Sequence, residues 1–173
     1  MEPAAQDIAA ATTNAAADEL DDAVKKIAHC VNQLSDEQVW WRPAASMNSI
    51  ANLILHLCGN IRQWITAGVG GVEFTRIRPQ EFSERGPIEK DELLRRLDTT
   101  VTEAKAAIVN ASAADLVDRR RIQGFDVTGL AAMFHSVAHF RGHTQEIVHL
   151  TRSQLGDDYK FDFVPTTTEQ GAL

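Results

Sequence analysis

Residues 131–152 carry four histidines, and their spacing limits what the chain can build around them. His135, His139 and His143 lie four residues apart, and Glu146 follows three residues later. An α-helix turns by about 100° per residue, so side chains three or four residues apart share one face. A stripe of imidazoles is a poor surface for a plain core and a good one for a metal ion. The stretch therefore predicts a helix that faces a functional site.

Three further segments have the apolar spacing of amphipathic helices. The four expected helices cover residues 20–34, 49–67, 89–109 and 128–154. Asn48 and Thr128 are the predicted N-caps of the second and fourth helices. Four helices predict an all-α, antiparallel four-helix bundle, with a long Gly- and Pro-containing connection over residues 68–88. We expect one domain over residues 1–173, with fraying of the first few residues and disorder in residues 166–173.

The overall charge argues against several classes of partner. The net charge is −7, from 17 Lys and Arg against 24 Asp and Glu, which disfavours binding to nucleic acid. The run Arg119–Arg121 is flanked by acidic residues and is predicted to be a solvated loop. No apolar run is long enough for a membrane span, and the N-terminus lacks the pattern of a secretory signal. Two cysteines give no disulfide framework, so we expect a cytoplasmic protein without a membrane partner.

The second predicted helix has a polar line between two aliphatic flanks. The line consists of Ser49, Asn52, His56, Asn60 and Gln63. Aliphatic flanks must be covered, so the polar line between them is expected to face an internal, partly wet cavity rather than solvent. Asn52, Asn60 and Gln63 are therefore candidate pocket-lining residues.

Together, the two helices predict a divalent metal site. His139 and His143 form an HxxxH pair on one helix, and His56 is the only histidine in the middle of another helix's inward stripe. Three histidine ligands leave a coordination position open for water or substrate. His135 is an alternative ligand in place of His143, or a group that contacts the substrate. Glu146 is a candidate general base, or a group that orients an imidazole.

The remaining histidines are predicted to lie outside the site. His29 lies roughly 160° around its helix from Val31, on the outer face. His149 lies about 80° from His139, toward the flank of the stripe. We expect a structural or exposed role for both.

Two segments, SIANLILHLCGNIRQWI and HSVAHFRGHTQEIVHLTR, resemble the DinB-like superfamily, also called YfiT-like metal-dependent hydrolases. The resemblance extends over about residues 34–152 and includes LSDEQVWWRP. It implies an up-down-down-up four-helix bundle that is often a homodimer. It also implies zinc or nickel bound by His56, His139 and His143. The family pattern HxGQ is replaced here by HTQE at residues 143–146.

The resemblance also implies an activity. Members of the superfamily include bacillithiol transferases and a mycothiol-dependent maleylpyruvate isomerase. The expected function is a metal-dependent enzyme acting on a small molecule, either a thiol S-transferase with a low-molecular-weight thiol as co-substrate or a hydrolase. A divalent metal suits both, because it can hold a thiol as thiolate or lower the pKa of water. The alternatives are a non-catalytic metal-binding bundle with a structural or storage role, and a haem bundle with His56 and His139 as axial ligands.

Overall fold

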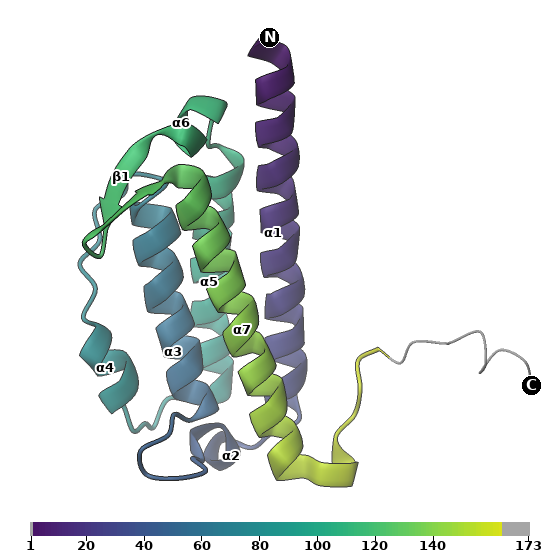
Figure 1. Ribbon diagram of the computed structural model, residues 1–173. Coiled ribbons are helices and arrows are strands. Elements are labelled where there is room, and N and C mark those ends of the chain that lie inside the picture. The colour runs from purple at the N-terminus through teal and green to yellow at the C-terminus, as the bar shows by residue number, and fades with distance from the viewer. Residues whose placement is uncertain (1, 164–173) are drawn as a thin grey trace, which may run out of the picture.

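Four long helices pack side by side in the computed structural model, which describes residues 2–163 (Figure 1). They are α1 (Glu2–Asn32), α3 (Ile50–Ile61), α5 (Lys90–Val109) and α7 (Gly129–Leu155). A π-helical segment, η1 (Arg62–Ala67), continues α3 to its end at Gly68. Both α1 and α3 pack against α5 and α7, which closes the bundle. α1 and α7 run in one direction and α3 and α5 in the other, which confirms the up-down-down-up bundle. The disorder predicted for residues 166–173 lies outside the described residues.

Short elements occupy the connections between the long helices. They are α2 (Asp36–Trp40), α4 (Arg78–Ser83), α6 (Ala113–Val117), β1 (Arg119–Ile122) and β2 (Phe125–Thr128). A short 3₁₀ helix, η2 (Gly156–Asp158), follows α7. α4 lies within the long connection predicted between the second and third helices, and it packs against α3. The predicted position of that connection is therefore correct, but part of it is ordered as a helix.

The prediction of a solvated loop at Arg119–Arg121 is wrong, because these residues form strand β1. β1 pairs antiparallel with β2 through a tight turn at Gln123 and Gly124, which both have positive φ (52° and 86°). Positive φ at both central residues matches the twist of a two-residue hairpin. Arg120 donates to the backbone oxygens of Gly68 and Val69, at 2.8 and 3.2 Å, so its side chain holds the hairpin against the end of η1.

Cap chemistry fixes where the two site helices begin. Thr128 is the N-cap of α7, as predicted, and its hydroxyl accepts a hydrogen bond from the Ala131 amide at 3.1 Å. The prediction of Asn48 as the cap of the second helix is wrong, because Ser49 takes that position. Ser49 and Asn52 form a capping box, in which each side chain accepts a hydrogen bond from the other residue's backbone amide. This reciprocal pair satisfies two free amides at once, which a lone Asn48 would not do.

The core lies between the four helices and consists mainly of aliphatic side chains. Its largest fully buried members include Leu20, Ile27, Ile54, Leu57, Leu97, Ile108 and Phe140. Within residues 2–163, no helix is both long enough and apolar enough to cross a membrane.

Cys58 is expected to resist thiol reagents in the folded protein. Cys58 and Cys30 are both buried free thiols, and burial raises the pKa of Cys58 to about 11. Because the thiolate is the reactive form, Cys58 should react much more slowly than a free thiol at about pH 8 and freely after unfolding. Labelling with a chromogenic disulfide reagent, with and without denaturant, measures both rates. Fast labelling of Cys58 under native conditions would contradict its burial.

Candidate metal centre

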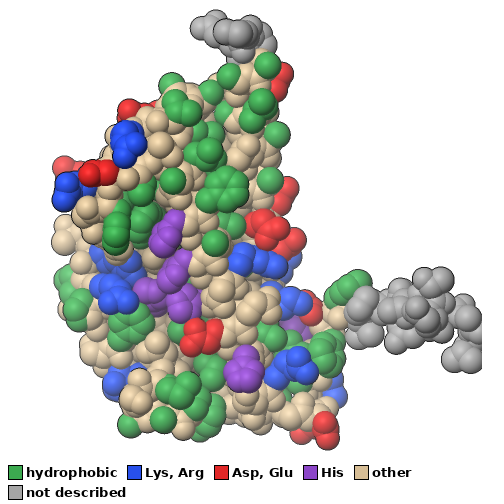
Figure 2. Space-filling view, viewed as in Figure 1, with side chains coloured by type: hydrophobic (Ala, Val, Ile, Leu, Met, Phe, Trp, Pro, Cys, Tyr) green, Lys and Arg blue, Asp and Glu red, His purple; other side chains and the backbone are tan. Residues whose placement is uncertain are grey.

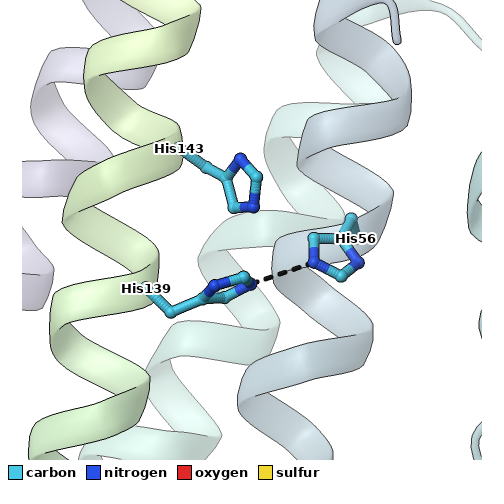
Figure 3. A group of neighbouring side chains, drawn as sticks. All are labelled: His56, His139 and His143. Atoms are coloured by element: carbon cyan, nitrogen blue, oxygen red, sulfur yellow. Dashed lines mark hydrogen bonds between the residues drawn. The ribbon is translucent and has the colours of Figure 1, made fainter. Parts of the chain in front are cut away.

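Three histidines from two antiparallel helices point toward one another (Figure 3). His56 comes from α3, and His139 and His143 come from successive turns of α7. The Nε2 atoms of His56 and His139 are 2.9 Å apart, and one nitrogen from each ring lies within 4.8 Å of the others. The structure therefore brings together the three predicted ligands. Imidazole nitrogens in such a group suit divalent zinc, copper or nickel, so the donor set fits the metal that the resemblance implies.

A buried ion pair holds the His56 ring. The Nδ1 atom of His56 lies 2.8 Å from Oε2 of Glu81, a residue of α4. Arg76 donates to both oxygens of the same carboxylate, at 2.6 and 2.7 Å. The exposed fractions of the Arg76 and Glu81 side chains are only 3% and 10%. His56, Glu81 and Arg76 therefore form one connected polar group beneath the site.

The charge of this group determines which His56 nitrogen carries hydrogen. Burial by itself raises the pKa of Glu81, but hydrogen bonds from Arg76 and His56 outweigh it, and the pKa is lowered overall. Glu81 is therefore a carboxylate, which can only accept, and Arg76 can only donate. The Nδ1 atom of His56 lies 2.8 Å from Oε2 of Glu81 and 3.0 Å from Nη2 of Arg76. The shorter contact, with the carboxylate, favours a hydrogen on Nδ1 that is donated to Glu81, which leaves the Nε2 lone pair facing His139. An outer hydrogen bond of this kind is how proteins orient metal-binding histidines.

Gly59 gives Glu81 room to reach His56. A β-carbon built at Gly59 would lie 2.0 Å from Oε1 of Glu81, which is too close for any side chain unless Glu81 moved. Gly59 follows His56 by three residues on α3, so the helix itself provides the gap next to its own ligand.

His143 is oriented in a similar way on α7. Its Nδ1 atom lies 2.7 Å from Oε2 of Glu146, and the side chain of Glu146 is 42% exposed. His139 has a different environment, because burial and then the nearby histidines lower its pKa to about 4. His139 is therefore neutral near pH 7, and the neutral imidazole is the form that binds metal.

The structure leaves His135 and His149 outside this group. His135 is exposed, and its ring packs against Trp64 with a centroid distance of 4.2 Å. It also lies parallel to the His139 ring at 6.0 Å, so it borders the site without joining the three rings. His149 is exposed, as expected.

The predicted pocket-lining residues lie on the helix that carries His56 and on its continuation η1, and they differ in the hydrogen bonds they make. The side-chain amide of Asn52 is buried and donates to the backbone oxygens of Glu81 and Glu84, at 2.8 and 3.1 Å, which holds α4 in place. Asn60 is also buried. Gln63 accepts a hydrogen bond from Arg76 at 3.1 Å, which connects it to the polar group under His56. The pocket-lining role of these residues stays a prediction.

In the space-filling view, several histidine side chains form a strip over the region where Figure 1 draws α3 and α7 (Figure 2). Hydrophobic side chains lie beside the strip, and Lys and Arg side chains are visible on either side of it. Part of the hydrophobic border is Phe82 of α4, whose ring lies 4.8 Å from the ring of His56.

Sequence reasoning missed Arg76, Glu81 and Phe82. All three lie in the predicted connection between the second and third helices, where no helical spacing indicates which side chains point inward. One sequence signal could have indicated this contact. Gly59 is a glycine within a helix, close to the predicted ligand His56, and a glycine at such a position allows another segment to approach the helix closely.

Comparison with solved structures supports the fold. A conserved protein from Enterococcus faecalis matches with a TM-score of 0.69 and 16% identity, over 81% of this chain and 95% of that chain. A DinB-like protein from Bacillus cereus matches with a TM-score of 0.61 and 14% identity, over 76% of this chain and 85% of that chain. At this level of identity the two structures establish a shared DinB-like fold.

Comparison with sequences gives the family. A search of curated proteins finds no match. A family model described as a protein of unknown function, DUF1572, matches residues 7–168. Since this match spans nearly the whole chain, the protein belongs to the DUF1572 family.

Proposed function

We propose that the protein is a metal-dependent enzyme that acts on a small molecule, with zinc or nickel bound by His56, His139 and His143. This proposal rests on one observation: the histidine rings converge, and two of them are also held in a fixed orientation. The three ring nitrogens approach one another from two helices, and carboxylates fix the outer nitrogens of His56 and His143. A histidine that only filled a core would not need this arrangement.

Thiol S-transfer is the reaction that these residues favour. A divalent metal at the three histidines would supply a Lewis acid able to hold a thiol as thiolate or to lower the pKa of water. Hydrolysis also calls for a carboxylate free to take a proton from water, but Glu81 is held by Arg76 and Glu146 by His143. We therefore assign Glu146 to positioning His143. His135, which is exposed beside His139, is the group we assign to proton exchange with the substrate.

Hydrolase activity is the second candidate, and a non-catalytic metal-binding bundle is the third. A purely structural zinc site usually has four protein ligands. Within the described part of the chain, the histidine group contains three possible ligands, which favours a catalytic role over a structural one. We also propose a homodimer, as the DinB-like resemblance implies, and a cytoplasmic location, as the cysteine content predicts. Exposed apolar side chains on α1 and α7, Ile8 and Phe134, support a second copy as the partner.

Conjugation of a thiol with an electrophile should depend on the metal. The test uses protein purified without chelator or nickel affinity resin, mixed with 2-sulfanylethanol or cysteine and a chromogenic aryl halide, and separately with a nitrophenyl ester. We expect conjugation that a chelator abolishes and that zinc or nickel restores. His135→Ala should lower the rate at unchanged metal content, and His149→Ala on the same helix is the control.

The other outcomes each decide between the candidates. Ester cleavage without thiol conjugation would favour the hydrolase. Stoichiometric metal without either reaction would support the non-catalytic bundle.

A further inference from the structure

We propose that the small molecule bound at the three histidines carries a carboxylate, which pairs with the guanidinium of Arg78 at the rim of the site. This inference rests on the proposed function, and it names the chemical class of the molecule on which that function would act.

Arg78 is placed beside the site by an aromatic contact. Its guanidinium carbon lies 4.9 Å from the ring centroid of Phe82, one turn further along α4. The same Phe82 ring lies 4.8 Å from the ring of His56. One phenyl ring therefore separates the guanidinium from a predicted metal ligand. An arginine held over an aromatic face keeps its planar donors free for another group.

Arg78 is also the uncompensated charge at this rim. Among the side chains of residues 4–163, no carboxylate lies within ion-pair distance of Arg78. The neighbouring arginine, Arg76, is already paired with Glu81, and the Glu146 carboxylate is engaged in a hydrogen bond with His143.

Another edge of the rim is aromatic. Trp64 contacts His135, and Phe125 of the hairpin stacks on Trp64 at 6.5 Å, with 61% of Phe125 exposed. The histidines are thus bordered both by a planar apolar surface and, through Phe82, by the guanidinium of Arg78.

The charge of the site itself favours an anion. Three neutral imidazoles leave the charge of a divalent ion uncancelled, because no carboxylate belongs to the ligand group. The chain as a whole carries a net charge of −7, so a local excess of positive charge is not a property of the whole surface. A carboxylate is the anion we infer, because its two oxygens match the fork of one guanidinium.

A matched pair of thiols tests this inference without requiring turnover. The probes are 3-sulfanylpropanoate and its primary amide, which have the same length and shape and differ in charge. Each is titrated into cobalt(II)-loaded protein, and binding is followed by the absorption band that a thiolate produces with cobalt. We expect the wild-type protein to bind the carboxylate about tenfold more tightly than the amide, as a charge-assisted hydrogen bond would give.

Arg78→Gln removes the charge and keeps most of the side-chain length. In this variant the two probes should bind within a factor of about two of each other, with the amide unaffected. Lys25→Gln, which removes one positive charge from an exposed position on α1, should keep the wild-type preference.

Three results would overturn the inference: equal affinities in the wild-type protein, an equal loss for both probes in Arg78→Gln, or the same change in Lys25→Gln. Cobalt content is measured first, by elemental analysis. Protein that takes up no cobalt, zinc or nickel overturns the proposed function and the inference together. Protein that is loaded with metal and shows no preference overturns the inference alone.

Discussion

Replacing His139 with alanine is expected to abolish stoichiometric metal binding. His139 contributes one of three converging nitrogens and faces Nε2 of His56 at 2.9 Å, so its loss leaves two ligands on different helices. The loss in affinity should exceed the roughly 10–100-fold that follows removal of an outer hydrogen-bond partner, because a ligand itself is removed. His56→Ala should have the same effect. Elemental analysis of protein purified without chelator or nickel resin gives the metal content.

The controls come from the same helix. His149 and His135 are exposed and lie outside the group of three, so His149→Ala and His135→Ala should keep the full metal content. A deficit in His135→Ala together with full content in His143→Ala would mean that His135 is the third ligand. Circular dichroism is needed beside the metal measurement for His56→Ala, because His56 is buried and its loss leaves Glu81 with one partner fewer. Retention of metal in both His56→Ala and His139→Ala would exclude this site.

The arrangement of helices and the three histidines could be predicted because each rests on helical spacing. Apolar residues every three or four positions define the faces of the long helices, and His139 and His143 share a face for the same reason. His56 could be added because it lies in a polar line that has aliphatic neighbours on both sides. These are properties of single helices, and they do not depend on how distant segments meet.

The hydrogen bond that orients His56 could not be predicted, because it depends on how α4 packs against α3. α4 reaches α3 only because Asn52 binds backbone oxygens of Glu81 and Glu84, and because Gly59 leaves space for a carboxylate. None of this produces a periodic pattern. Strand β1 at Arg119–Arg121 was missed for a related reason. Three successive arginines are typical of a solvated loop, although here the side chain of Arg120 donates to backbone oxygens at the end of η1.

Glu81→Gln is expected to weaken metal binding by roughly 10–100-fold while every ligand stays in place. The glutamine amide can donate as well as accept, so it no longer forces the hydrogen of His56 onto Nδ1. Chelator competition measures the affinity, and ¹⁵N-resolved NMR of the histidine rings reports which His56 nitrogen carries the hydrogen. Glu146→Gln is the matched comparison at His143. Its effect should be smaller, because the side chain of Glu146 is 42% exposed, against 10% for Glu81.

The effect of Glu81→Gln on protein stability must be separated from its effect on the orientation of the His56 ring. The substitution also leaves the Arg76 guanidinium buried without its carboxylate partner. Breaking a buried ion pair costs about 3–5 kcal/mol, whereas replacing both partners with apolar groups is often neutral. The double variant Arg76→Met with Glu81→Leu should therefore recover much of the unfolding free energy lost in Glu81→Gln, as measured by urea denaturation. Its metal affinity should stay low, because nothing orients the His56 ring. If affinity recovered together with stability, Glu81 would act only by holding α4 in place.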